Sequence, residues 1–251
     1  MYWVDALGME IDINCDVGEG IGNEADVMPL ISSCNIACGG HAGDEQTMRT
    51  AISIAKLNGV RIGAHPSYPD RTNFGRKPMD ISANALINSI QQQLAIFSET
   101  LQQEQGILHH IKPHGALYNG IAKDKELAHI FLDALTGFEK VPIYVPFGSQ
   151  IQFEAQKRNI PVILEAFADR NYNNDLSLVS RTKENALIVS PKKVLDHVVR
   201  IAEQGKVLTV QRQGKKISAD TFCIHGDTPS ALEILVYLHR ELPNHNIQIK
   251  A

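Results

Sequence analysis

Four histidines share an unusual setting, because each follows an apolar run and has glycine or proline beside it. They are His41 in CGGHAGD, His65 in GAHPSYPD, His114 in IKPHGALYN and His225 in CIHGDTP. Imidazole exchanges protons near neutral pH and is a common metal ligand, and small or rigid neighbours leave it open to a ligand. A single histidine of this kind is equally compatible with a loop residue bonded to a nearby carbonyl. Four together predict a shared site.

Acidic and amide side chains accompany these histidines near the N-terminus. Asp12, Asn14 and Asp16 alternate with apolar residues, and Glu19 follows in the turn DVGEG. Because buried carboxylates need partners or a chemical role, we expect Asp16, at the end of this run, to be catalytic. We interpret Asp12 as a structural, hydrogen-bonded residue and Asn14 as a substrate contact. Glu19 fits either a substrate contact or a turn residue.

Cationic residues indicate that the ligand is an anion. Lys112 precedes a proline, which favours extended backbone and places its side chain on the same face as His114. The segment EAFADRNYNNDLSLVSR adds four charged candidates for substrate binding, which are Glu165, Asp169, Arg170 and Arg181. The two arginines have the geometry to hold a carboxylate or phosphate by paired hydrogen bonds, although surface ion pairs are the common alternative.

Two further aspartates, Asp44 and Asp227, stand directly before predicted helices. Either one fits a helix cap, in which the carboxylate accepts hydrogen bonds from free N–H groups. Either one also fits a residue that points into the site, and we include both among the predicted substrate contacts.

A metal ion is a possible component of the site. Cys34, Cys38 and His41 suggest structural zinc, but a fourth ligand at suitable spacing is missing and both cysteines fall on one side of an apolar strand. A catalytic divalent ion held by Asp16, His65 and His114 is the better hypothesis, since ligands from separate strands need no local spacing.

The elements that carry these residues alternate between strand and helix periodicity. The predicted strands cover residues 11–17, a run reaching 38, 60–64, 107–111, 143–145, 162–167 and 222–225. The predicted helices cover residues 44–58, 82–105, 124–135, 151–157, 191 onward and 228–240, with a hairpin around 213–214.

This order predicts an α/β fold, specifically an irregular parallel (β/α) barrel of seven strands. In such a barrel the loops that follow the strands gather on one rim. An open doubly wound sheet is the alternative, but the chain has neither G-x-G-x-x-G after its first strand nor a Walker phosphate loop. We expect residues 9–251 to form a single domain, preceded by an extension at residues 1–8.

Composition narrows the function classes. The net charge is −4 and no basic cluster is interleaved with aromatic residues, so neither nucleic acid nor an anionic membrane is an expected partner. The four cysteines form no CxxC pair, and we expect neither a secretory nor a membrane-spanning segment. We therefore expect a cytoplasmic protein that acts on a small molecule, with homo-oligomerisation left open.

The motifs together resemble the LamB/YcsF family, to which the A subunits of bacterial 5-oxoprolinase belong. The similar stretches are INCDVGEGIG, SCNIACGGHAGD, GAHPSYPDRTNFGR, IKPHGALYN, EAFADRNY and CIHGD, and they run from about Met9 to Leu238. One departure is Gly40, which stands where the family usually has phenylalanine. The resemblance implies an irregular barrel related to the glycoside hydrolase and deacetylase folds.

The resemblance also implies ATP-driven hydrolysis of the lactam 5-oxo-L-proline to L-glutamate, with Mg²⁺ accompanying ATP and with partner subunits B and C. We expect Lys112 with Arg170 to neutralise the transferred phosphoryl group, and Asp16 with His65 or His114 to act as base and acid. The remaining candidates would position substrate or relay protons; they include His41, Asp44, His225 and Asp227.

Two rival functions remain open. One is a metal-dependent deacetylase or amidohydrolase that needs no ATP, and the other is a non-catalytic carrier of the lactam. Because the chain has no phosphate loop, ATP is held either by an unusual arrangement on the rim or by the partner subunits.

Overall fold

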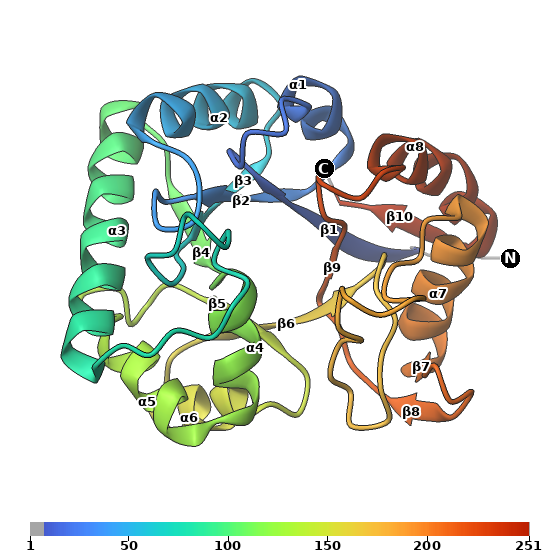
Figure 1. The fold of residues 1–251 in the computed structure, drawn as a ribbon. Coiled ribbons are helices and arrows are strands. Elements are labelled where there is room, and N and C mark those ends of the chain that lie inside the picture. The colour runs from blue at the N-terminus through green and yellow to red at the C-terminus, as the bar shows by residue number, and fades with distance from the viewer. Residues whose placement is uncertain (1–7, 251) are drawn as a thin grey trace, which may run out of the picture.

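A closed barrel of parallel strands forms the centre of the protein (Figure 1). The computed structural model describes residues 8–250, so the predicted extension lies almost entirely outside the described residues. Within residues 8–250, seven strands make the barrel: β1 (Met9–Val17), β2 (Ser33–Ala37), β3 (Arg61–His65), β4 (Leu108–Ile111), β5 (Ile143–Pro146), β6 (Val162–Phe167) and β9 (Thr221–Cys223). Strand β1 pairs with both β2 and β9, which closes the sheet. The structure confirms the predicted seven-stranded barrel, and the alternative prediction of an open doubly wound sheet is wrong.

Three short strands lie outside the barrel wall. Strand β10 (Ile247–Ile249) pairs in parallel with the first residues of β1 and was not predicted from the sequence. Strands β7 (Lys206–Leu208) and β8 (Gly214–Lys216) form the antiparallel hairpin predicted around residues 213–214.

Helices surround the barrel on its outer side (Figure 1). They are α1 (Glu24–Val27), α2 (Glu45–Leu57), α3 (Ala83–Gln103), α4 (Gly115–Lys123), α5 (Lys125–Asp133), α6 (Gln150–Lys157), α7 (Pro191–Gln204) and α8 (Ala231–Glu241), with 3₁₀ turns at Met28–Leu30 and Leu242–His245. Among the described residues, none of these helices is long and apolar enough to cross a membrane.

Helix α4 is missing from the sequence-based prediction because glycines open and interrupt it, and glycine disfavours helix. Its buried Leu117, Tyr118 and Ile121 show the helical spacing that the prediction overlooked. His114 lies between the end of β4 at Ile111 and the start of this helix at Gly115, so the helix helps to fix the position of His114.

The two faces of the strands differ in polarity. In β1 the apolar Ile11, Ile13, Cys15 and Val17 belong to the hydrophobic core shared with the helices. The alternate residues of the same strand are polar, and they hydrogen-bond to side chains of other barrel strands. Burying one such aliphatic side chain contributes about 1.5–3 kcal/mol. The outer layer therefore stabilises the fold and leaves the barrel interior free for polar groups.

Candidate active site

A pocket of about 550 Å³ opens at the rim where the strands end. The predicted residues that line it are Asp16, Glu19, His65, Lys112, His114, Arg170, Arg181 and His225. The other six predicted residues do not line this pocket. They are Asn14, His41, Asp44, Glu165, Asp169 and Asp227. The barrel thus brings together residues as far apart in the chain as Asp16 and His225, as the sequence predicts.

A buried interior network lies at the floor of this pocket and consists of Asn14, Asp16, Asn35, Lys112 and Glu165. The Lys112 ammonium is 2.9 Å from Asp16 Oδ1 and 2.9 Å from Glu165 Oε1. The Asn35 amide donates to Asp16 at 2.8 Å, and the Asn14 amide donates to Glu165 at 3.0 Å. Each charge in the network therefore has an opposite charge or a hydrogen-bond partner.

The network keeps its charged groups ionised. Burial by itself would raise the pKa of Asp16, but His65 and the Lys112 ammonium together hold that pKa well below its usual value. Burial would lower the pKa of Lys112, but the charges of its neighbours, Asp16 first, raise it well above its usual value. The ammonium is thus already balanced by two carboxylates, which argues against the predicted role of Lys112 in neutralising a phosphoryl group.

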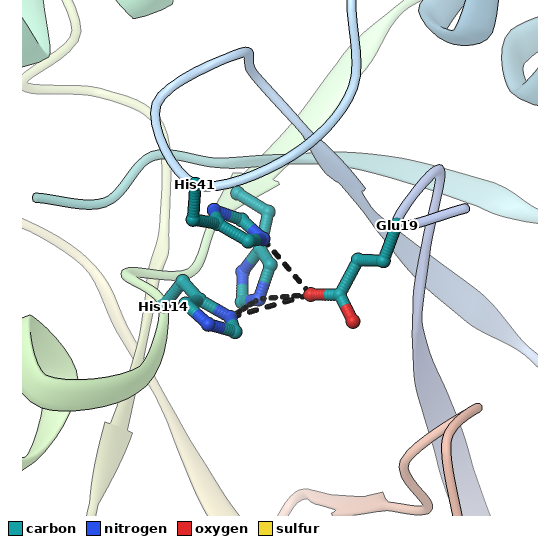
Figure 2. A group of neighbouring side chains, drawn as sticks. Glu19, His41 and His114 are labelled. Atoms are coloured by element: carbon teal, nitrogen blue, oxygen red, sulfur yellow. Dashed lines mark hydrogen bonds and ion pairs between the residues drawn. The ribbon is translucent and has the colours of Figure 1, made fainter. Parts of the chain in front are cut away.

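A second group of side chains, the rim cluster, consists of Glu19, His41, His65 and His114 (Figure 2). One Glu19 oxygen, Oε1, is 2.9 Å from His41 Nε2, 3.3 Å from His114 Nδ1 and 3.8 Å from His65 Nε2. The rings of His41 and His114 stack in parallel with centroids 3.7 Å apart. Glu19 therefore joins the histidines, which resolves the two readings of this residue in favour of a site position.

Two histidines of the rim cluster, His41 and His114, have lowered pKa values, which favours their neutral form. Burial lowers the pKa of His41, and it lowers that of His114 well below the usual value with further help from His41 and His65. Asp16 lies next to this cluster, with Oδ2 3.5 Å from His65 Nε2. The interior network and the rim cluster thus meet at Asp16 and His65.

His225 follows β9, the strand that pairs with β1, and its ring is oriented by Asp169. Asp169 is buried, accepts from the His225 backbone N–H at 3.0 Å and lies 3.0 Å from His225 Nδ1. The Thr228 hydroxyl also donates to it. Asp169 was predicted to contact substrate, but the structure places it behind His225, as a residue that positions the ring.

Two arginines and Asp227 form an ion-pair bridge across the pocket mouth. Asp227 is 2.8 Å from Arg181 and 2.6 Å from Arg76. Burial would raise the pKa of Asp227, but Arg181 and Arg76 lower it. By its sequence alone, Arg76 in the segment SYPDRTNFGR fits either a ligand contact or a surface ion pair. Only the structure shows that it lines the pocket together with Arg181.

Arg170 and Glu165 occupy more enclosed positions than the sequence predicts. The Arg170 guanidinium donates to the backbone carbonyls of Val179 at 2.7 Å and Ala186 at 3.3 Å, which ties down the long loop after β6. It still lines the pocket, but part of its hydrogen-bonding capacity is used within the loop. Glu165 is buried in the interior network and faces Lys112, which argues against direct contact with substrate.

Asp44 is the one predicted site residue that the structure separates from the others. It is exposed and caps helix α2, accepting from the Thr47 backbone N–H at 2.8 Å and from the Thr47 hydroxyl. These hydrogen bonds lower its pKa. Of its two predicted roles, the helix cap is the one that the structure supports.

The cysteines do not form a metal site with His41. Cys34 and Cys38 are buried free thiols, and burial raises the pKa of each to about 12. Cys38 accepts a hydrogen bond from the His65 backbone N–H at 3.2 Å. The two groups of potential metal ligands found among residues 8–250 contain neither Cys34 nor Cys38.

Two residues of the barrel interior were missed in the sequence. Asn35 connects Asn14 and Asp16, and its signal was a polar residue at an inward position of an otherwise apolar strand. The sequence suggests only a structural role for His110; its Nε2 lies 2.6 Å from Asn35 Oδ1 and its ring stacks on Tyr144. Gly63 makes room for that ring, because a Cβ there would lie 2.1 Å from His110 Nε2.

The departure at Gly40 has a local explanation. A Cβ at this position would lie 2.4 Å from Gln93 Oε1 and 2.5 Å from Ser67 Oγ. Gln93 is buried and bonds both the backbone N–H and the carbonyl of Ser67, at 3.0 and 2.9 Å. Its amide therefore occupies space beside Gly40 that a larger side chain would need, and it anchors the segment that follows His65.

The chain has clear relatives among known proteins. Residues 11–251 match the LamB/YcsF family. A Staphylococcus haemolyticus (strain JCSC1435) protein, named as the A subunit of 5-oxoprolinase, is 41% identical over 97% of this chain and 100% of the relative. One of the same name from Thermococcus sibiricus (strain DSM 12597 / MM 739) is 39% identical over 96% of this chain and 97% of the relative.

Solved structures agree with this result. The lactam utilization protein from Thermus thermophilus has a TM-score of 0.88 and 34% identity, covering 97% of this chain and 100% of that chain. A GH113 β-1,4-mannanase has a TM-score of 0.51 and 10% identity, covering 91% of this chain and 99% of that chain. The second likeness shows the fold alone and places the barrel beside that of a glycosidase.

Proposed function

Since the chain belongs to the LamB/YcsF family, we propose that it is the A subunit of a 5-oxoprolinase, which opens 5-oxo-L-proline to L-glutamate with consumption of ATP. The observation that carries this proposal is the convergence of Asp16, His65 and His114 on one pocket with a cationic rim. Pockets of a few hundred Å³ suit small ligands, and the rim matches the carboxylate of 5-oxoproline.

The chemistry explains why ATP is needed. A lactam is an unreactive amide, and ATP supplies a phosphoryl group to its oxygen and leaves as ADP. Water then adds to the ring carbon, the carbon–nitrogen bond breaks as the nitrogen takes up a proton, and a second water releases phosphate. The chain must therefore bind the substrate carboxylate, activate water and deliver a proton to the departing nitrogen.

The pocket residues match these tasks. We assign the substrate carboxylate to Arg181 and Arg76 at the mouth, where it would take the place of Asp227. His65 donates from Nδ1 to the Lys112 carbonyl, 2.7 Å away, so its Nε2, which lies 3.0 Å from His114 Nδ1, is the ring nitrogen that takes a proton from water. Asp16, 3.5 Å from that nitrogen, stabilises the imidazolium that results. His114, neutral because of its lowered pKa, is the second proton-transfer group, and it relays a proton to the ring nitrogen.

The pocket supplies only some of the cationic groups that the phosphates of ATP need. Lys112 is balanced by two carboxylates and Arg170 donates to two carbonyls, so neither is free to hold phosphate. Arg76 and Arg181 are suitable only if phosphate displaces Asp227 from them. We therefore assign the remaining nucleotide contacts, including those to Mg²⁺, to partner subunits B and C.

The test is an assay of phosphate and glutamate release from 5-oxoproline and ATP, by this chain alone and with subunits B and C. We expect turnover with all three subunits, and a loss of at least about 100-fold in kcat for Asp16→Asn. Asp12→Asn is the matched control: Asp12 also points inward from β1, but it bonds Ser33 at 2.9 Å and Arg61 at 3.0 Å outside the pocket.

The rival functions give different results in the same assay. Glutamate release without ATP would replace the proposal with a metal-dependent amidohydrolase. Binding of 5-oxoproline without turnover, even with both partners present, would indicate a carrier. Equal activity of Asp16→Asn and Asp12→Asn would reject the catalytic role of Asp16.

A further inference from the structure

The rim cluster presents four ligand atoms to one point. Glu19, His41, His65 and His114 each offer one oxygen or nitrogen, and these atoms all lie within 4.8 Å of one another (Figure 2). Their side chains are almost fully enclosed, with exposed fractions of 5%, 0%, 1% and 6%. Polar side chains this enclosed need partners, because an uncompensated buried polar group is costly.

Backbone carbonyls fix which ring nitrogens face that point. His65 Nδ1 lies 2.7 Å from the Lys112 carbonyl oxygen, and His114 Nε2 lies 3.0 Å from the Phe74 carbonyl oxygen. A carbonyl only accepts, so each of these nitrogens carries the proton and donates it. His65 Nε2 and His114 Nδ1 are consequently left as lone-pair acceptors directed at the cluster.

These two acceptors face each other across 3.0 Å, with the Glu19 carboxylate 3.3 Å from one and 3.8 Å from the other. Three acceptors at such distances repel unless a positive charge lies among them. One proton between the two rings would satisfy that pair, and Glu19 would then depend on a proton at His41 Nε2, 2.9 Å away. A single ion in contact with all of them satisfies every acceptor at once.

His41 adds the fourth donor atom. Its Nε2 lies 2.9 Å from Glu19 Oε1, whereas its buried Nδ1 has no hydrogen-bond partner within residues 8–250. The polar contact of this ring is thus directed at the cluster. The ring stacks on His114 with an interplanar angle of 2° and centroids 3.7 Å apart, so the lone pairs of the two rings lie in parallel planes. One of the two rings must therefore rotate for both to contact the same ion.

We infer that Glu19, His41, His65 and His114 bind one divalent first-row transition-metal ion, of the class of Zn²⁺, Fe²⁺ or Mn²⁺. Donor atoms about 2.1 Å from a tetrahedral ion lie about 3.4 Å from each other. The observed separations of 2.9, 3.0, 3.3 and 3.8 Å bracket that value. Three imidazoles favour such ions over Mg²⁺, which prefers oxygen ligands.

The carbonyls of Lys112 and Phe74 act as the outer partners that commonly orient metal-binding histidines. This assignment revises the ligand set expected from the sequence, because Glu19 and His41 join His65 and His114 while Asp16 lies beside the ion. A bound ion would polarise water or the lactam oxygen next to Asp16. His65 and His114 would then be ligands, and proton transfer would fall to Asp16 and the metal-bound water.

The site is tested by titrating chelator-treated protein with Co²⁺ in the absence of 5-oxoproline and ATP. We expect one Co²⁺ per chain, with the visible absorption of a four- or five-coordinate ion. Glu19→Gln and His114→Gln should each weaken binding at least about tenfold, the usual effect of removing a group that supports a metal site. Zn²⁺ should displace Co²⁺ and abolish the absorption.

His225→Gln is the matched control. Its side chain belongs to a second group in the same pocket, Asp16, Cys223 and His225, that is also compatible with a metal. Unchanged Co²⁺ affinity in this variant, with affinity lost in His114→Gln, locates the ion in the rim cluster. The reverse pattern overturns the assignment.

Absence of Co²⁺ absorption in correctly folded wild-type protein also overturns it, as does a downfield proton signal shared by His65 and His114 that persists when Zn²⁺ is added. Circular dichroism and thermal unfolding establish that each variant is folded. Because neither substrate is present, a negative result leaves the proposed lactam hydrolysis untouched.

Discussion

The interior network and the rim cluster are both buried and polar, but they differ in how their groups are satisfied. In the interior network, Lys112 lies between two carboxylates and the amides of Asn14 and Asn35 donate to them. In the rim cluster, acceptors face acceptors. Glu165 Oε2 in the interior network is also buried without a hydrogen-bond partner within residues 8–250, so an unmatched acceptor alone does not mark a ligand site. The difference lies in the cation: Lys112 lies among the carboxylates of the interior network, whereas no lysine or arginine of the described part of the chain lies among the acceptors of the rim cluster.

The largest expected effect comes from breaking the interior network. Lys112→Met leaves Asp16 and Glu165 buried without their common counter-ion, and loss of one partner from a buried ion pair costs about 3–5 kcal/mol. Urea-induced unfolding measures this change. Addition of Glu165→Gln should recover part of the loss, since one carboxylate charge is removed with the cation. Equal stability of the single variant and wild type would contradict the compensated network.

The rim cluster should respond in the opposite way, by gaining stability from an added ion. Free Zn²⁺ at 100 times its dissociation constant should raise the free energy of unfolding by about 2.7 kcal/mol. Thermal unfolding with and without Zn²⁺ measures the gain, and Glu19→Gln should lose most of it. A gain of the same size in Glu19→Gln would place the stabilising ion elsewhere.

His197 is a buried histidine that belongs to neither the interior network nor the rim cluster, and it shows how burial alone affects stability. Burial lowers the pKa of His197 to about 4, whereas a histidine in the unfolded chain has a pKa of about 6.5. Between these values the unfolded state binds the proton and the folded state does not, so stability falls as pH falls. His197→Gln should reduce this slope by up to about 1.4 kcal/mol per pH unit between pH 4 and 6.5. Unfolding curves measured across that range test it.

The smallest effect is expected at Asp44. Asp44→Ala removes the cap of α2 and should lower the thermal midpoint only slightly, because the carboxylate is exposed. Co²⁺ affinity and glutamate release should stay at wild-type values, since Asp44 contacts neither group. A strong loss of activity in a stably folded Asp44→Ala protein would restore the substrate contact expected from the sequence.

Much of the fold could be predicted because its signals are local. Alternation along residues 11–17 is the period of a strand with two different faces, and Ser82 with the apolar spacing that follows marks helix α3. Helix α4 was not predicted because its two glycines weaken the helical signal. Strand β10 was not predicted because three residues are too few to show a strand period.

The sequence predicts which residues belong to the candidate site better than it predicts which of them contact one another. A histidine after a strand and next to glycine or proline belongs to the rim in any parallel barrel, so His41, His65, His114 and His225 could be found from the chain alone. The cap at Asp44 and the rim position of Glu19 could not be separated in this way. Both are acids in glycine-containing turns, and their different places depend on how each loop folds back.

The sequence by itself determined the barrel, its polar interior face and the set of residues near its rim, because strand and helix periods act over a few residues. Only the tertiary structure decided that Lys112 is neutralised by Asp16 and Glu165, that Arg76 and Arg181 share Asp227, and that backbone carbonyls set the histidine tautomers. These outcomes depend on the register and depth of strands distant in the chain, which no local pattern encodes.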